Sequence, residues 1–201
     1  LVYEPMKKHT HFQIGGNADY MVIPGSLIEL SSILRFAYNS FIPVLVIGNG
    51  SNLLVRDGGI RGIVIKTTEL NLCEIEQNII QADCGITLEE LAKLAMENGL
   101  TGLEFASGIP GTLGGAVVMN AGAYDGEMKD IVVESQYLNE CIELKHLPFE
   151  RHFFGYRSSS FQGINATITS VTLKLQNGEK AQIRERMEDL HKQRWEKQPM
   201  D

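Results

Sequence analysis

Glycine is concentrated between Gly102 and Gly126, where seven residues are glycine and most apolar residues are small. Because glycine loses much backbone entropy on folding, such a run needs unusual backbone angles or a backbone that something approaches closely. Pro110 fixes one turn, and the pairs Ser107-Gly108 and Gly111-Thr112 leave backbone N–H groups free to face an anion. A glycine-rich loop between two strands would have the same composition, so this stretch alone leaves both interpretations open.

A second short stretch, Val44 to Val55, favours the anion-binding interpretation. It reads VLVIGNGSNLLV, which predicts a buried strand, a tight turn at Gly48–Asn52, and a second strand after it. The dinucleotide-binding fingerprint G-x-G-x-x-G needs a third glycine and a following helix, whereas Leu53 occupies that third position here. A Rossmann loop is therefore not expected. The absence of Gly-Lys-Ser/Thr after either glycine cluster also excludes a nucleotide triphosphatase phosphate loop.

Length and charge narrow the class of protein. The 201 residues suffice for one large domain or two small ones. A formal net charge of −7 and a pI of about 5.3 argue against general nucleic-acid binding. Three widely spaced cysteines and the lack of an H-E-x-x-H motif predict neither a disulfide framework nor a metal site. No apolar run reaches the roughly 18 residues of a membrane span, so we expect a cytoplasmic protein without a membrane partner.

The first half of the chain alternates strand and helix patterns. Ser26 is a candidate cap for one helix, and Thr87-Leu88-Glu89-Glu90 is a capping box that should begin a second, which Gly99 should end. This alternation predicts a small α/β subdomain. The predicted strands in this half are 20–23, 44–47, 63–66 and 79–82.

After the glycine-rich stretch, strands dominate. They are predicted at 131–138, 142–147 and 167–175, and the last of these alternates as a half-exposed antiparallel strand does. A charged surface helix is predicted over 179–197, and its inner face should consist of Ile183, Met187 and Leu190.

Several motifs taken together resemble the UDP-N-acetylenolpyruvoylglucosamine reductase family, and the resemblance covers essentially the whole chain. Singly, none of them would be specific. They are Thr10 to Gly16, Gly48 to Leu53, Gly102 to Gly126, Gly155-Tyr156-Arg157 with Ser159 and Phe161, and Lys197-Gln198-Pro199.

The resemblance implies an α+β, FAD-binding fold of the vanillyl-alcohol-oxidase type. Residues 1–70 would form an α/β subdomain and residues 71–201 a mostly antiparallel one, with FAD between them. A third, substrate-binding domain is expected to be missing from this chain, because both ends look cut.

The resemblance also implies which residues contact FAD without a covalent bond. The turn after residue 47 and the loop around Pro110 would hold the pyrophosphate, and the run from 114 to 123 would lie along the cofactor. The implied cofactor-binding residues are Ile14, Gly15, Gly48, Asn49, Gly50, Ser51, Asn52, Leu53, Ser107, Gly108, Ile109, Pro110, Gly111, Thr112, Gly114, Gly115, Asn120, Ala121, Gly122 and Ala123.

The chemistry implied is reduction of UDP-N-acetylglucosamine enolpyruvate by NADPH through FAD, a step of peptidoglycan synthesis on which cell shape and division depend. Arg157 matches the family arginine at the enolpyruvyl carboxylate, and Tyr156 would line the same site. An arginine suits this role because its fork binds a carboxylate at two points and stays charged. The family's proton-donating serine lies in a Gly-Ser-Thr-Phe stretch that these residues do not include. His11 stands where the family more often has serine or threonine.

Two other functions are compatible with the same motifs. A non-catalytic FAD-binding module could have lost the substrate domain. The second alternative is a different flavin oxidase of the same fold. Some of those oxidases carry FAD covalently on a histidine or cysteine, but no such attachment motif surrounds His9 or His11. The genomic sequence after Asp201 distinguishes the enzyme from the module.

Overall fold

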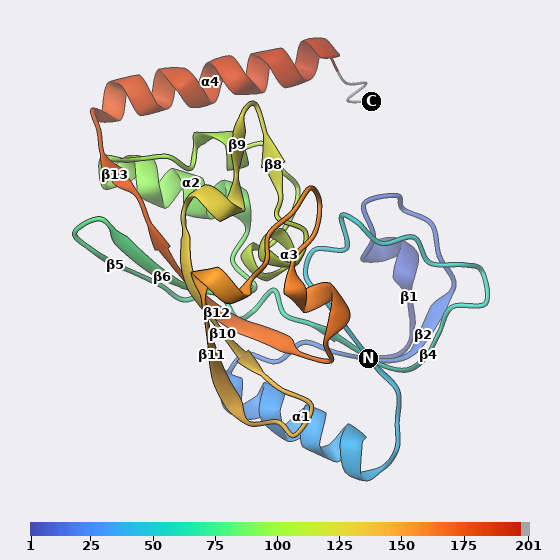
Figure 1. Ribbon diagram of the computed structural model, residues 1–201. Coiled ribbons are helices and arrows are strands. Elements are labelled where there is room, and N and C mark those ends of the chain that lie inside the picture. The colour runs from blue at the N-terminus through green and yellow to red at the C-terminus, as the bar shows by residue number, and fades with distance from the viewer. Residues whose placement is uncertain (198–201) are drawn as a thin grey trace.

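The computed structural model describes residues 1–197 and divides them between two main β-sheets and four α-helices (Figure 1). Gln198 and Pro199 of the Lys-Gln-Pro motif lie outside the described residues. The helices are α1 (Leu27–Asn39), α2 (Leu88–Glu97), α3 (Leu113–Val118) and α4 (Lys180–Lys197). The strands are β1 (Val2–Pro5), β2 (Asn17–Val22), β3 (Val44–Ile47), β4 (Ile60–Lys66), β5 (Cys73–Glu76), β6 (Ile79–Asp83), β7 (Leu100–Thr101), β8 (Gly122–Ala123), β9 (Gly126–Glu127), β10 (Val132–Leu138), β11 (Leu144–Pro148), β12 (Thr167–Lys174) and β13 (Gln176–Asn177).

The first sheet has the order β1-β2-β4-β3, in which β2, β4 and β3 are parallel and β1 is antiparallel. Its inner strand β4 is apolar, and Ile63, Val64 and Ile65 are buried, as the apolar run predicts. Helix α1 begins where expected, because the Ser26 hydroxyl accepts the N–H of Glu29 at 3.2 Å.

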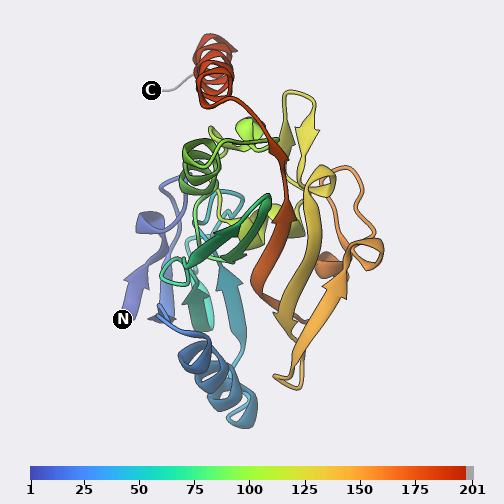
Figure 2. The ribbon, with the colours of Figure 1, turned by 90° about the vertical axis from the view of Figure 1, so that its left-hand side faces the viewer.

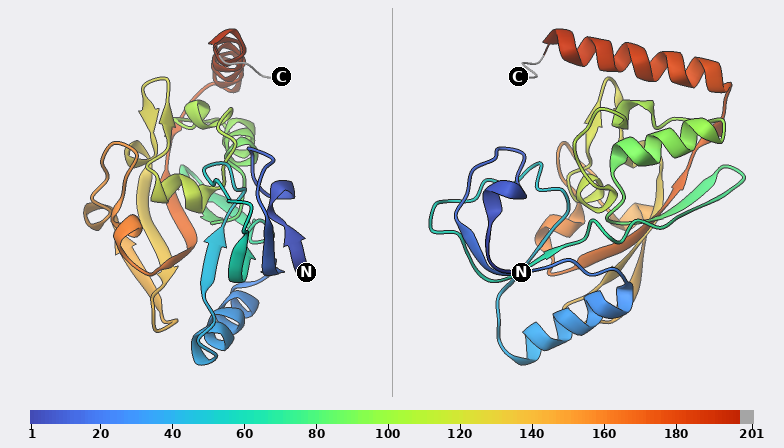
Figure 3. Two further views of the ribbon diagram at one scale, coloured as in Figure 1. Left: turned by 90° about the vertical axis from the view of Figure 1, so that its right-hand side faces the viewer. Right: turned by 180° about the vertical axis from the view of Figure 1, so that it is seen from behind.

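The second sheet is antiparallel throughout and has the order β11-β10-β12-β6-β5. Helix α3 packs against β6 and β12 on the face of this sheet that turns toward the first sheet, and α2 packs beside β7 and α4 (Figure 2; Figure 3). The Thr87 hydroxyl caps α2 by accepting the N–H of Glu90 at 3.2 Å, and the stripe Leu88, Leu91, Ala92 and Ala95 is buried. The larger hydrophobic core includes these helices and the five-stranded sheet, and it extends to α1 and to β4 of the first sheet.

One expectation about strands is wrong, and another holds only in part. Residues 53–56 form no strand, because they cross to the Gly15–Gly16 loop, where Val55 packs against Gly15 and the Arg56 carbonyl accepts the N–H of Gly16. Strand β12 alternates as expected in its second half, where Thr172 is half-buried and Lys174 is exposed, but residues 167–171 are all buried in the middle of the sheet.

Helix α4 lies apart from both sheets and crosses the η2 turn (Glu104–Ala106) (Figure 1). Ile183 and Leu190 are buried and Met187 packs against the core, as predicted for its inner face. The Arg194 guanidinium donates to the carbonyl of Gly108, so the helix touches the glycine-rich stretch. Among residues 1–197, no helix is long and apolar enough to span a membrane.

Candidate functional site

A cavity of about 460 Å³ lies where the end of β3 meets the start of α3. One wall comes from β3 and the turn after it, and the other from the loop before α3 and from α3 itself. Its volume is within the range of cofactor sites, roughly 300–1,000 Å³. The lining residues are Leu45, Val46, Ile47, Gly48, Asn49, Gly50, Ser51, Asn52, Leu53, Leu88, Ile109, Pro110, Gly111, Thr112, Gly115, Ala116, Val118, Met119, Ala121 and Arg157.

Backbone N–H groups are exposed along one end of this cavity. From Gly48 to Leu53, no N–H group has a hydrogen-bond acceptor within the described part of the chain. The turn is held in place by its carbonyls instead, because Gly50 accepts the N–H of His11 at 3.2 Å. Successive free N–H groups in a turn form an anion-binding concavity, which is what a pyrophosphate requires.

The two adjacent glycines at the start of α3 face opposite ways. Gly115 is exposed to the cavity, and a Cβ there would meet only Thr112 Oγ1, at 3.7 Å. Gly114 is buried, and a Cβ there would come within 2.9 Å of Cys84 Cβ. Burial raises the pKa of Cys84 to about 12, so its thiol stays protonated inside the core. Only Gly115 of the pair therefore keeps the cavity open.

Arg157 also lines this cavity and lies in a tight turn closed by N–H to carbonyl bonds between Gly155 and Ser158 of 3.0 and 3.3 Å. Its side chain is exposed and donates to the carbonyl of Gly122 at 3.0 Å. It also lines a second cavity of about 220 Å³ beside the β8–β9 hairpin, together with Tyr156, which is 92% exposed. A permanent positive charge thus stands at the junction of the two cavities, where an anionic group could be held.

Sequence and structure comparisons place the chain in a family. A model described as FAD binding domain matches residues 18–141. The UDP-N-acetylenolpyruvoylglucosamine reductase of Pediococcus pentosaceus is 43% identical over 201 residues, which is 100% of this chain and 67% of that protein. The reductase of Alkaliphilus oremlandii is 46% identical over 201 residues, again 100% of this chain and 66% of that protein. The chain belongs to the UDP-N-acetylenolpyruvoylglucosamine reductase family.

Solved structures show the fold of this reductase family member. The crystal structure of UDP-N-acetylenolpyruvylglucosamine reductase from Thermus caldophilus matches with a TM-score of 0.82 at 33% identity, over 97% of this chain and 69% of that one. Alkyldihydroxyacetonephosphate synthase matches with a TM-score of 0.61 at 18% identity, over 78% of this chain and 31% of that one, a likeness of fold alone. The α+β FAD-binding fold of the vanillyl-alcohol-oxidase type is thereby confirmed. The chain spans about two thirds of the curated reductases it matches, from 65% to 67%.

The structure brings most of the predicted cofactor residues together. Asn120, Gly122 and Ala123 line the second cavity. Ile14, Gly15, Ser107, Gly108 and Gly114 line neither cavity. The remaining members of the predicted set, which all line the larger cavity, are Gly48, Asn49, Gly50, Ser51, Asn52, Leu53, Ile109, Pro110, Gly111, Thr112, Gly115 and Ala121.

The predicted residues outside the cavities have other contacts. The Ser107 hydroxyl donates to the Glu104 carbonyl at 2.9 Å, and a Cβ on Gly108 would approach Arg194 Nε to 3.0 Å.

Gly122 lines the second cavity, but the hairpin also requires glycine at this position. A Cβ there would lie 2.7 Å from Glu127 Cβ. Enlarging Gly122 would therefore disrupt β8–β9 before it filled the larger cavity.

Sequence reasoning missed the apolar wall of the site. Strand β3 is apolar throughout, and its sequence does not alternate, so the pattern did not show which of its residues face a cavity. In α3 and just after it, the predicted run 114–123 includes the lining residues Ala116, Val118 and Met119, but only a predicted helix would have shown which of its residues face the cavity. The missed lining residues are Leu45, Val46, Ile47, Leu88, Ala116, Val118 and Met119.

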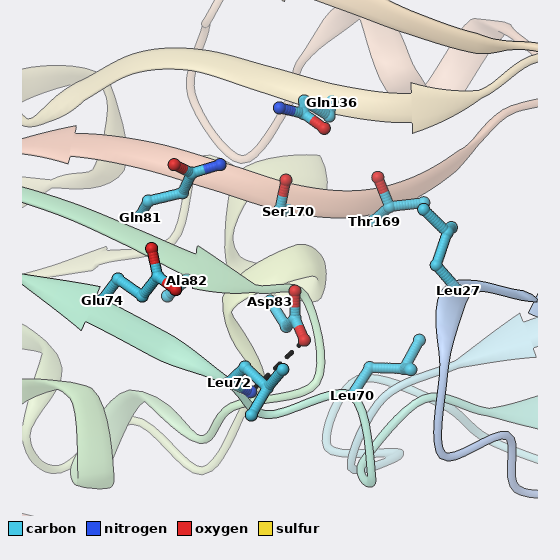
Figure 4. A pocket seen from close by; sticks show the side chains of 10 residues that line it. All are labelled: Leu27, Leu70, Leu72, Glu74, Gln81, Ala82, Asp83, Gln136, Thr169 and Ser170. Carbon is cyan, nitrogen blue, oxygen red and sulfur yellow. Dashed lines mark hydrogen bonds between the residues drawn. The ribbon is translucent and has the colours of Figure 1, made fainter.

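A separate cavity of about 240 Å³ lies on the five-stranded sheet near the start of α1 (Figure 4). It combines the side chains of Glu74 and Asp83 with apolar Leu27, Leu70 and Leu72. The Asp83 carboxylate accepts the N–H of Leu72 at 3.3 Å, and burial raises the pKa of Asp83. None of the predicted site residues lines it. No cluster of metal-ligating side chains occurs anywhere in residues 1–197.

His152 fixes the start of the segment that carries Arg157. Its ring is fully buried and stacks on Phe154 at 4.8 Å. Nδ1 lies 3.1 Å from the Pro148 carbonyl, which can only accept, so Nδ1 carries the proton and Nε2 accepts from the Ser135 hydroxyl at 2.9 Å. Burial lowers the pKa of His152, which keeps the ring neutral.

This buried histidine predicts a loss of stability in acid. Below the ordinary histidine pKa of 6.5, the unfolded chain binds a proton at His152 that the folded chain does not. The free energy of unfolding should therefore fall as pH drops from about 6.5 toward the lower folded-state pKa. Urea unfolding between pH 7.5 and 5 measures this fall. The double variant His152→Phe/Ser135→Ala should show a shallower fall, and exposed His146→Gln should match the parent; equal slopes for all three would contradict the assignment.

Proposed function

We propose that this chain is the FAD-binding part of an enzyme that uses NADPH to reduce UDP-N-acetylglucosamine enolpyruvate to UDP-N-acetylmuramate. The observation that carries the proposal is one cavity lined both by a turn with free N–H groups and by Arg157. Membership of the reductase family supports the reaction class, oxidoreduction in peptidoglycan synthesis.

The residues of the larger cavity suit FAD. We assign the N–H groups of residues 48–53 to the pyrophosphate oxygens, since these donors have no acceptor in the described chain. Gly115 and Ala116 leave room along α3 for a flat ring system. The lining contains no cysteine or histidine, the side chains through which some flavin oxidases carry FAD covalently, which supports non-covalent binding. When bound, FAD supplies a two-electron carrier that takes a hydride from NADPH and gives one to the enolpyruvyl group.

Arg157 is assigned to the enolpyruvyl carboxylate. Negative charge develops there as the double bond is reduced, and a fixed cation in a partly enclosed site stabilises it without reorganisation. Tyr156 borders the same cavity and would line the substrate site. No Gly-Ser-Thr-Phe stretch occurs in the 201 residues, so we place the proton donor outside them.

Flavin binding and turnover test this proposal separately. The purified 201-residue chain should take up FAD from solution, seen as flavin absorbance that stays with the protein on gel filtration. It should not oxidise NADPH at an enzyme rate when given the enolpyruvyl substrate, because loss of a general acid alone costs about 10²- to 10⁴-fold. The protein encoded by the complete gene should do so.

Each result has a distinct meaning. No FAD uptake by the chain would overturn the cofactor assignment. Uptake of FAD without turnover by the complete gene product would support a non-catalytic module instead. Normal turnover by the 201 residues alone would show that the proton donor lies within them.

A further inference from the structure

The side chain of Asn120 connects three segments that are distant in sequence. It follows α3 directly, is 2% exposed, and has a left-handed backbone with φ +41°. Its Nδ2 donates to Glu127 Oε2 at 2.6 Å and to the Gly155 carbonyl at 3.0 Å. Its Oδ1 accepts the N–H of Lys129 at 2.9 Å. The amide therefore joins the end of α3 to the hairpin and to the base of the Arg157 turn.

The Arg157 turn depends on bonds of this kind for its position. Arg157 has φ +51°, a conformation that costs a non-glycine residue energy and that the surroundings must maintain. Three side chains link the turn to the end of α3. One of them is Gln162, whose Nε2 donates to the Arg157 carbonyl at 3.1 Å and to Met119 Sδ at 3.2 Å. On one side Asn120 binds Gly155, and on the other the Ser159 hydroxyl donates to the Val118 carbonyl at 2.8 Å. Figure 1 shows the segment between β11 and β12, in orange, passing beside α3 and the β8–β9 hairpin.

The same end of α3 lines the larger cavity through Val118 and Met119. The bond from Asn120 to the Gly155 carbonyl therefore helps to fix where the Arg157 turn lies relative to the wall of the cavity formed by Val118 and Met119. On the strength of the proposed function, we propose that Asn120 is a positioning residue, which holds Arg157 where the enolpyruvyl carboxylate binds. It does this through its neutral amide, because only an amide donates to both Glu127 and Gly155 while accepting from Lys129.

The isosteric variant Asn120→Asp separates positioning from packing. It keeps the shape and the Oδ1 acceptor but turns a carboxylate oxygen toward Glu127 and the Gly155 carbonyl. The groups that face this position are Glu127, its ion-pair partner Lys129, Asp125 and Arg157. Because two carboxylates in one site share a proton, the carboxyl introduced at position 120 should remain protonated to a higher pH than an isolated one. Once protonated, it can donate again to Gly155.

The experiment measures the two half-reactions of the complete, FAD-loaded enzyme by stopped flow, between pH 6 and 9. At pH 8.5, Asn120→Asp should slow reduction of the enolpyruvyl substrate about 10²-fold, the cost of misplacing a catalytic group by about an ångström. Flavin reduction by NADPH and retention of FAD should stay at parent values. The ratio of variant to parent rate should rise toward one as pH falls to 6.

Asn139→Asp is the matched control. Its amide also donates to a glutamate, Glu143, at 3.2 Å and accepts the N–H of Cys141 at 3.0 Å, but it lies in an exposed turn and lines neither cavity. It should match the parent in every measurement.

The proposal is overturned if Asn120→Asp keeps the parent rate at pH 8.5, or if it slows both half-reactions equally and loses FAD. A defect that does not change with pH would overturn the role of the amide donor. Failure of the parent enzyme to reduce the enolpyruvyl substrate would instead contradict the proposed function itself. The rate of the parent enzyme therefore tests the proposed function, and the ratio of variant to parent rate tests the role of Asn120.

Discussion

Gly115→Val is expected to give a folded protein that no longer retains FAD. A Cβ at this position would meet only Thr112 Oγ1, at 3.7 Å, and Gly115 lines the cavity, so we expect the new side chain to extend into the cavity rather than into the core. Valine also favours a helix more than glycine does, so α3 should persist. Overpacking a site costs about 1–3 kcal/mol, and this corresponds to a loss of FAD affinity of up to about 10²-fold. Titration followed by quenching of flavin fluorescence measures the affinity, and thermal unfolding measures the fold.

Two further glycines provide the comparison. Gly114→Ala places its Cβ against Cys84 and should lower the free energy of unfolding by about 1–3 kcal/mol while the folded protein binds FAD normally. Gly58→Val is the neutral control, because no atom lies within 4 Å of the position of its Cβ. If Gly115→Val bound FAD as the parent does, Gly115 would not face the bound cofactor, and the assignment of this face of α3 to the FAD site would be wrong.

Arg157→Ala in the complete enzyme is expected to slow reduction of the enolpyruvyl substrate by about 10²- to 10³-fold, the usual loss when one fixed donor is removed from a developing charge. Arg157→Lys should recover part of the rate, because it keeps the charge but loses the two-point fork. Flavin reduction by NADPH should change little, since that step precedes entry of the enolpyruvyl group. Single-turnover measurement of each half-reaction separates the two effects.

The control for this series is Arg151→Ala, another exposed arginine in the same segment that lines neither cavity. It should behave as the parent. Equal slowing of both half-reactions by Arg157→Ala would make Arg157 a nucleotide-binding or structural residue. The bond that Arg157 donates to Gly122 gives that outcome a physical basis, so FAD retention must be measured in the same variant.

Local signals predicted the elements that depend on local interactions. The Ser26 and Thr87 caps predicted where α1 and α2 begin, because a hydroxyl two or three residues from a free N–H is a sequence-local feature. Helix α3 was not predicted, because Leu-Gly-Gly-Ala is a poor helix sequence and packing against β6 and β12 stabilises it. The burial of both faces in the first half of β12 was also missed, since it depends on neighbouring strands and on Leu27, which lines the same cavity as Thr169 and Ser170.

The same distinction between local and long-range interactions explains which parts of the site were predicted. The turns at Gly48–Leu53 and Ile109–Thr112 were predicted because their glycine and proline residues carry a local backbone meaning. Which neighbours of those turns face the cavity depends on how α3 is rotated, and the sequence does not show that Gly115 faces outward and Gly114 inward. Asn120 was predicted as a cofactor contact, which stays a prediction, and the sequence did not show that its amide binds two protein segments.

The free N–H groups at residues 48–53 have a consequence for the lifetime of the protein. They lie on a turn of the four-stranded sheet, while the opposite wall belongs to helices packed on the five-stranded sheet. A ligand in this cavity therefore joins the two halves, and mass action makes it stabilise the folded state, by about 2.7 kcal/mol when its free concentration is 100 times the dissociation constant. A cell short of riboflavin should accordingly degrade this chain faster, because proteases act on the fraction that opens. Vitamin supply would then set the abundance of the protein as well as its activity.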